Sequence, residues 1–545
     1  KLWPPDAVAK NSSTSFYGNI TALSESPKVE GLLFAGTDDG LVHVRESDGT
    51  WRKIEGLPGI PERTYVSRIE ASRHAADTVY AAFNNHKMGD FKPYLLKSVD
   101  RGRTWTSIAG DLPARGSVWA IVEDHVDPNL LFAGTEFGVF FTRNGGGNWT
   151  QLKGGIPTIA VRDLAIQRRE SDLVAGTFGR GFYVLDDYSP LRQAAAVEKP
   201  ATLFPVGRVE AYFESSPLGN RNKSFMGDSY HLSPNPPFGA VFTYSLSEGL
   251  KSRKKTRQEA EKKADKEKKA IEYPTLEALR AEVDEEDPAI HLVVADAQGN
   301  VVRRLEGPVT AGVNRVAWDL RFPPANPTSF DKPDLKNPYA DVPLGPPAAP
   351  GSYTVTLVKR QEGKVTTLAG PERFEVVPLR AGSLPAADQA RLSEFLGKTM
   401  RLQRAALGTS AAIREAGERL RYAKKAIDDT PAKEAGLAEE ARALEARLRE
   451  IRIVVDGDQA ASRRFYPTSP SIRDRIESIV NAQWSASGPP TGTSLEQYAI
   501  ASADLQEQTR KLAQLVDKDL AALEAKMDAA GAPWTPGRVP IWSGP

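Results

Sequence analysis

Eight residues in four similar turns carry side chains that can bind or cleave a ligand. Three are acids, and the other five combine an amide, an imidazole, two aromatic rings and a cation: Asp38, Asp39 and Glu136, then Asn85, His86, Phe137, Phe178 and Arg180. Two carboxyl groups roughly 5 to 10 Å apart, one with a raised pKa, supply the acid and the nucleophile or base of a glycosidase. Acids in tight turns are also ordinarily solvated or accept backbone N–H bonds, so a structural role stays open.

Other chemistries find no support in the sequence. None of the six histidines pairs with another at a metal-ligand spacing, and there is no cysteine. A nucleophile elbow, a P-loop and a dinucleotide fingerprint are all missing from the sequence. We therefore expect no bound metal and no cofactor, and disulfides are excluded.

The candidate residues belong to an internal repeat. The segment 32–40 (LLFAGTDDG) returns at 130–138 (LLFAGTEFG), with related copies at 78–83 and 173–177. The period is about 45 to 50 residues, and each unit contains three or four short strands, which is typical of propeller blades. In a propeller the turns between the second and third strands of each blade share one face. The eight candidate residues are therefore predicted to surround one mouth.

A second motif recurs in the turn after the third strand. Residues 98–105 (SVDRGRTW) match the Asp-box pattern S-x-D-x-G-x-T-W, with degenerate copies at 48–51 and 144–149. Its key residues suit a tight hairpin: Asp100 accepts backbone N–H bonds, Gly102 adopts positive φ and Trp105 covers the turn. We interpret Ser98, Asp100, Gly102 and Trp105 as structural residues.

With these motifs the chain resembles the bacterial BNR/Asp-box repeat proteins related to the sortilin (Vps10) propeller, which are often labelled glycosyl hydrolase-like. Further segments that carry the resemblance are 176–187 (GTFGRGFYVLDD), 316–321 (VAWDLR) and 532–536 (APWTP). The resemblance implies a secreted, periplasmic or cell-surface bacterial protein. Sialidases, xyloglucanases and non-enzymatic receptors are among such relatives. Arg180 alone does not supply the arginine cluster that a sialidase needs.

The predicted propeller is incomplete. Residues 1–8 look like the outermost strand and exit turn that follow an Asp-box, so 1–190 are expected to hold four full blades and a remnant. An open ring leaves strand edges and sheet faces unpaired. We expect the missing blades on a separate polypeptide, the N-terminal fragment of the same precursor after a cut. The alternative is a small closed ring of about five blades.

The second predicted domain is a β-sandwich. After a connector at 191–238, short alternating strands over 239–380 indicate an immunoglobulin- or fibronectin-like fold, interrupted by a charged insertion at 251–287 and a proline-rich loop at 321–350. The run 251–270 holds ten basic and four acidic side chains and no aromatic residue. Because bases need aromatic partners for stacking, we favour a solvated helical or disordered excursion over nucleic-acid binding.

The last third is predicted to be helical. Apolar stripes over 381–530 indicate an antiparallel bundle, in which they form the core; a partner-binding helix pair is the alternative. The tail, 531–545, is expected to be extended and to dock its two tryptophans, Trp534 and Trp542, on another domain.

Composition sets the remaining limits. The 545 residues carry a net charge of +1, and no apolar run approaches the ~18 to 20 residues of a membrane span. The fold class expected is multidomain, mainly β plus α. We favour an extracytoplasmic ligand-binding or assembly protein without its own catalysis, with a carbohydrate or peptide ligand. A glycoside hydrolase is the rival, and a structural subunit, as a homo-oligomer or in a larger surface assembly, is the third reading.

Overall fold

The computed structural model describes residues 18–214, 233, 235–331, 333–334, 337, 342–379, 386–430, 436–540 and 542. The chain divides into two compact units, 1–204 and 205–545. The predicted outermost-strand remnant at 1–8 lies outside the described residues.

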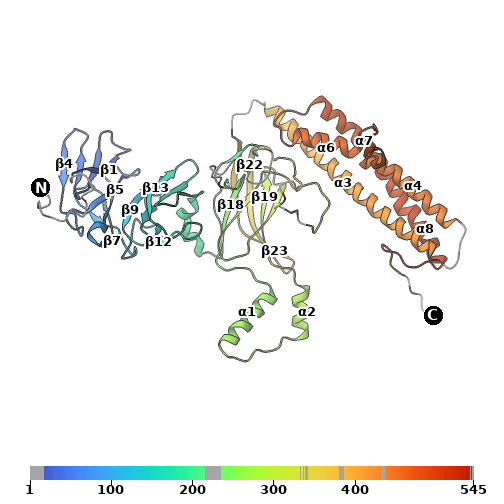
Figure 1. Ribbon diagram of the computed structural model, residues 1–545, viewed down its shortest axis with the longest axis horizontal. Coiled ribbons are helices and arrows are strands. Elements are labelled where there is room, and N and C mark those ends of the chain that lie inside the picture. The colour runs from blue at the N-terminus through green and yellow to red at the C-terminus, as the bar shows by residue number, and fades with distance from the viewer. Residues whose placement is uncertain are drawn as a thin grey trace. The chain divides into compact units, whose positions relative to one another are not determined.

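The first unit consists of four consecutive antiparallel sheets, each with its strands in chain order (Figure 1). The first three sheets have four strands each, and the fourth has three where a full blade is expected. Their bounds are β1 (Ile20–Glu25), β2 (Leu33–Thr37), β3 (Val42–Arg45) and β4 (Trp51–Ile54); β5 (Tyr65–Ala71), β6 (Val79–Asn85), β7 (Asp90–Ser98) and β8 (Thr106–Ser107); β9 (Val118–Glu123), β10 (Leu131–Thr135), β11 (Gly138–Thr142) and β12 (Thr150–Gln151); β13 (Val161–Gln167), β14 (Asp172–Thr177) and β15 (Phe182–Leu185).

Neighbouring sheets pack face to face through three separate apolar cores. In β10, Leu131 and Ala133 face the second sheet, whereas Phe132 faces the fourth. The strand is therefore buried at every position, because both of its faces are covered. This stacking of similar small sheets is the architecture of propeller blades.

The turn between β7 and β8 is closed by the Asp-box residues. Ser98 Oγ accepts the N–H of Gly102 at 2.7 Å, and Asp100 accepts the N–H and the hydroxyl of Thr104 at 2.8 and 2.6 Å. These bonds from Thr104, with a further one from Ser98, lower the pKa of Asp100 to about 2. The carboxylate thus serves the turn it belongs to.

The turn between β11 and β12 repeats this network with other residue types. Thr142 Oγ1 accepts the N–H of Gly146 at 3.1 Å, and Asn144 Oδ1 accepts the N–H of Asn148 at 3.0 Å. The degenerate sequence therefore folds with the same hydrogen-bond pattern as the turn at 98–105.

A buried ion pair fixes the segment after the fourth sheet. Asp124, which follows β9 and is fully buried, accepts Nε and Nη2 of Arg192, both at 2.8 Å, and the hydroxyl of Tyr188 at 2.5 Å. Arg192 belongs to the short helix η2 (Ser189–Glu198). Burial raises the pKa of Asp124, but the bonds from Arg192 and Tyr188 outweigh it and lower the pKa to about 2.

The second unit contains two facing β-sheets. One includes β18 (Ala240–Leu246) and β21 (Gly312–Trp318); the other has the order β17 (Val209–Ala211), β23 (Lys364–Pro378), β22 (Gly351–Gln361), β19 (Ala289–Asp296), β20 (Val301–Gly307). Aromatic rings fill the space between them. The ring centres of Trp318 and Tyr353 are 5.2 Å apart, and those of Phe242 and Phe374 are 5.5 Å apart. Strand β17 pairs in parallel with β23 and lies inside the segment expected to be a connector.

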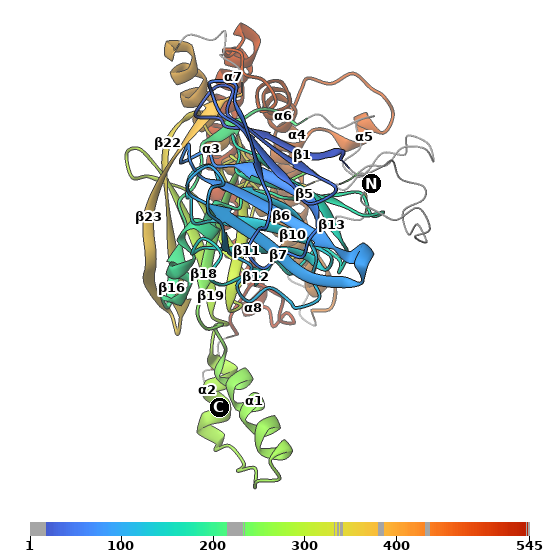
Figure 2. The same cartoon turned by 90° about the vertical axis from the view of Figure 1, so that its left-hand side faces the viewer.

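The charged insertion forms two helices, α1 (Arg253–Lys266) and α2 (Leu276–Asp284), which lie side by side in both views (Figures 1 and 2). Arg257 joins them through a bidentate contact with Glu282, at 2.6 and 2.8 Å. Neither helix has a buried residue. This agrees with the predicted solvated helical excursion. The proline-rich loop at 321–350 lies partly outside the described residues.

The C-terminal part is a helical bundle. It comprises α3 (Ala386–Asp428), α4 (Leu437–Asp456), α5 (Gln459–Ser462), α6 (Ile472–Gln483), α7 (Gly492–Gln514), the π-helical η4 (Leu515–Leu520) and α8 (Ala521–Ala529). The predicted apolar stripes meet in one core that includes Leu420, Leu444, Leu505 and Leu523. In the tail, Trp534 and Trp542 are 57% and 85% exposed. Docking of these rings on another domain stays a prediction.

Candidate ligand-binding site

The turns after the second strands lie beside the starts of the first strands. In three sheets the residue after the second strand donates its N–H to the residue before the first strand: Asp38 to Asn19, Glu136 to Ser117 and Phe178 to Ala160, at 3.1, 3.1 and 2.9 Å. Side chains near the starts of β9 and β13 therefore belong to the same end of the sheets as the predicted candidates.

Five side chains gather there, and we call them the mouth cluster: His86, Trp119, Glu136, Arg162 and Phe178. Trp119, in β9, is the centre. Its Nε1 donates to Glu136 at 2.9 Å, and the ring of His86 lies 5.1 Å from its ring at an edge-on angle of 65°. Trp119 is only 8% exposed, because its neighbours cover it.

Arg162, from β13, completes the cluster. Its guanidinium carbon lies 3.5 Å from the centre of the Trp119 ring and 5.1 Å from that of Phe178. Among the described residues it makes no ion pair and donates no hydrogen bond. Burial lowers its pKa, opposed by Glu136, but an arginine side chain stays cationic. The N–H groups at its edge are thus available to a ligand.

His86, in the short helix η1 (His86–Met88), is a neutral member of the cluster. Its Nδ1 is hydrogen-bonded to the side chain of Asn84, at 2.6 Å from Oδ1. Burial lowers the pKa of His86, and the charges of Arg162 and Lys87 lower it further, against an opposing effect of Glu136.

We expect the NMR titration of His86 to have a midpoint below the ordinary histidine value of about 6.5. Because Arg162 repels the imidazolium, Arg162→Ala should raise that midpoint, and Glu136→Gln should lower it. His74 is the internal reference, since it bonds Asp124 O instead and lies outside the cluster. An unchanged midpoint in Arg162→Ala would contradict the proximity of the two groups.

The lowered pKa of His86 sets the direction in which stability changes with pH. A lowered folded-state pKa means that protonation of His86 opposes the folded state. The cluster therefore contributes its full stability above the unfolded-state pKa, about 6.5, and loses stability as the pH falls below it.

The structure brings together three of the eight predicted candidates: His86, Glu136 and Phe178. The other five candidates bond elsewhere or do not contact the cluster among the described residues. Asp38 accepts N–H bonds from Gly18 and Asn19, and Asn85 donates to Asp90. Asp39 accepts the hydroxyl of Thr37. Phe137 and Arg180 have no ring or ion-pair contact with the cluster among the described residues.

Sequence reasoning missed the two central residues, Trp119 and Arg162. Aligning the first strands places Thr21, Ser67, Trp119 and Arg162 at one repeat position. Thr21 and Ser67 each donate a hydroxyl to the next sheet, at 2.9 and 2.8 Å. A tryptophan and an arginine at a position that otherwise holds a small hydroxyl residue are the signal that identifies them.

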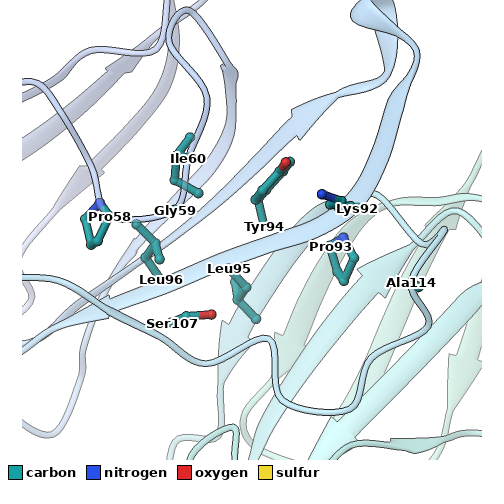
Figure 3. Close-up of a pocket in the computed structure, with 10 residues that line it drawn as sticks. All are labelled: Pro58, Gly59, Ile60, Lys92, Pro93, Tyr94, Leu95, Leu96, Ser107 and Ala114. Carbon is teal, nitrogen blue, oxygen red and sulfur yellow. The ribbon is translucent and has the colours of Figure 1, made fainter.

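A separate apolar hollow of about 340 Å³ lies beside β7 (Figure 3), lined by Pro58, Gly59, Ile60, Lys92, Pro93, Tyr94, Leu95, Leu96, Ser107 and Ala114. None of these ten residues belongs to the mouth cluster. The lining contains no carboxylate and no imidazole. Among the described residues, no group of acids and histidines is arranged to hold a metal ion. In the described part of the chain, no helix is long and apolar enough to cross a membrane.

No protein-family model and no curated protein matches the chain. Among solved structures, it is similar to YCF48 bound to a D1 peptide, with 15% identity over 31% of this chain and 51% of that one and a TM-score of 0.25. YCF48 from Cyanidioschyzon merolae has 20% identity over 30% and 52%, with a TM-score of 0.24. PorZ, an essential surface component of the type-IX secretion system of Porphyromonas gingivalis, has 13% identity over 69% and 47%, with a TM-score of 0.27.

The chain spans about half the length of each of these structures. Their similarity is too low to bear on function. The assignment of propeller blades to the first unit therefore rests on its own strand order and packing.

Proposed function

We propose that this chain is an extracytoplasmic binding protein whose mouth cluster captures a peptide through a carboxylate, without catalysis of its own. It is built on a propeller split between this chain and a second polypeptide, the N-terminal part of the same precursor. The resemblance to secreted Asp-box proteins supports the location outside the cytoplasm.

The observation that carries the proposal is the guanidinium of Arg162, stacked on Trp119 and without a partner among the described residues. Stacking occupies one face of the planar group and leaves its N–H edge, a rigid fork that matches the two oxygens of a carboxylate. The ring beneath restricts the side chain before the ligand arrives, which lowers the entropic cost of binding.

A peptide fits the surroundings better than a sugar. Sugars stack on open aromatic faces, but Trp119 is covered by Arg162 and lies at 8% exposure. Phe178, beside the guanidinium, is 67% exposed. A carboxylate next to an apolar side chain meets both groups at once. None of the three predicted acids is free for the hydrolase reading, because Asp38 accepts N–H bonds from Gly18 and Asn19, Asp39 accepts the hydroxyl of Thr37, and Glu136 accepts from Trp119.

The proposal is tested by measuring the binding of dye-labelled peptides that end in leucine or phenylalanine. Each peptide is prepared with a free C-terminal carboxylate and as the C-terminal amide. We expect the acids to bind more tightly than the amides. Arg162→Ala should weaken binding of the acids roughly ten- to a hundredfold, since a hydrogen bond to a charged group contributes about 1.5–3 kcal/mol.

Arg162→Lys should recover little, because a point charge cannot replace the planar fork. Arg143→Ala, an exposed arginine in the β11–β12 turn at the other end of β11, is the matched control and should bind like the wild type. Equal binding of acids and amides would overturn the proposal. So would full affinity in Arg162→Ala.

A further inference from the structure

The two end sheets of the first unit each leave a face uncovered that is covered in the other sheets. In the first sheet, the uncovered face is seen by comparing its first strand, β1, with the first strands of the other three sheets. In each sheet one residue of the first strand pairs with the equivalent alanine of the second strand. These residues are Leu23, Ile69, Ile121 and Leu164. The last three are 1%, 0% and 1% exposed and pack on the preceding sheet, whereas Leu23 is 64% exposed.

The fourth sheet shows the opposite face. Phe182 and Val184 of β15 hold the register positions that Val42 and Val44 hold in β3. Val42 and Val44 are fully buried against the second sheet. Phe182 and Val184 are 81% and 55% exposed, although they are equally apolar. The repeat has thus placed core residues on a face that no described residue of the first unit covers.

The outer edge of β15 is open as well. In the first three sheets the third strand pairs with a fourth: β3 with β4, β7 with β8 and β11 with β12. Within the described residues β15 pairs only with β14. An unpaired edge of a sheet is a template for another strand.

We infer that both end faces and the β15 edge are bound by further blades of the same repeat, contributed by polypeptide outside these 545 residues. The inferred contacts continue an established interface, because the same register positions bury a sheet face at three junctions within the first unit. At the β15 end the partner supplies a strand and an apolar sheet face; at the β1 end it supplies a face. Binding at both ends by sheets of this kind continues the stack towards a ring.

Site-specific cross-linking in the organism that makes the protein tests this inference. A photoreactive phenylalanine analogue replaces Leu23 or Phe182 in the full chain, and Val313 serves as the control, since it is 58% exposed in β21 of the second unit. We expect cross-links from positions 23 and 182 to strands of Asp-box repeats that are absent from this sequence, and none to such strands from position 313.

Three outcomes would overturn the inference: cross-links to a second copy of this chain, cross-links to a protein without such repeats, or a native particle of 59.3 kDa that shows no cross-link at either position. A second measurement guards against a misfolded variant. Phe182→Glu and Leu23→Glu should lose the repeat-bearing polypeptide while their circular dichroism stays unchanged, and Val313→Glu should retain it. Retention by both end-face variants would contradict the proposal, and because neither residue belongs to the mouth cluster, peptide binding is scored separately.

Discussion

Asp124→Ala is expected to lower the unfolding free energy of the first unit by about 3–5 kcal/mol, because removing one partner of a buried ion pair leaves the other charge uncompensated. Here the remaining charge is the guanidinium of Arg192, which loses both of its bonds to Asp124 at 2.8 Å. Tyr188 loses the acceptor of its hydroxyl in the same variant. Urea unfolding followed by hydrogen exchange in β9 and β13 measures the effect.

Asp127→Ala is the matched control. Asp127 lies three residues away and accepts a single backbone N–H, from Asn129, so we expect a change below about 1 kcal/mol. Equal effects of the two variants would show that the network around Asp124 contributes no more than a turn. The variant Asp124→Asn separates the effect of charge from that of shape. Asparagine keeps the side-chain volume, but it is neutral and cannot accept both guanidinium bonds.

The same pair sets a pH dependence. Hydrogen bonds from Arg192 and Tyr188, against the effect of burial, lower the folded-state pKa of Asp124 to about 2. The unfolded-state value is about 3.9. The pair therefore contributes its full stability above about pH 4 and loses it as the pH falls towards 2. In Asp127→Ala this loss should remain, and in Asp124→Ala it should be absent.

Trp318→Ala is expected to cost the second unit about 3–5 kcal/mol, as large-to-small changes of buried tryptophan do. Trp318 is fully buried between the two sheets, contacts Tyr353 and Phe374, and donates Nε1 to the carbonyl oxygen of Arg321 at 2.9 Å. The variant leaves a cavity and an unpaired acceptor. Scanning calorimetry with hydrogen exchange measures which unit is affected.

Because Trp318 and the blade strands β1 to β15 belong to different compact units, exchange in β1 to β15 should not change in Trp318→Ala. Phe330→Ala is the control, since that ring is completely exposed. Equal loss of protection in β1 to β15 and in β18 to β23 would contradict this expectation. A loss no greater than that of Phe330→Ala would contradict the packing of Trp318.

The sequence predicted the blades because each carries its own copy of the evidence. An apolar second strand such as 130–135 and a turn such as 98–105 recur in order, and local hydrogen bonds close each turn. The incomplete fourth sheet and the strand at 209–211 escaped prediction, because pairing across a sheet is not a local property.

The candidate site was predicted in its location more than in its members. Turn positions after the second strands identified His86, Glu136 and Phe178, because all such turns share one end of the sheets. Trp119 and Arg162 lie within strands, where apolar or alternating patterns are read as core. Only the comparison of one repeat position across the four sheets reveals them.

Contact between Arg162 and a ligand carboxylate is the central feature of the proposed function. The most direct measurement is the NMR signal of the Arg162 guanidinium nitrogens, assigned by its loss in Arg162→Lys, as a free-acid peptide and then its amide are added. We predict that the acid shifts and sharpens this signal while the amide leaves it in place. If the acid binds and the Arg162 signal does not move, the mouth cluster is not the carboxylate site.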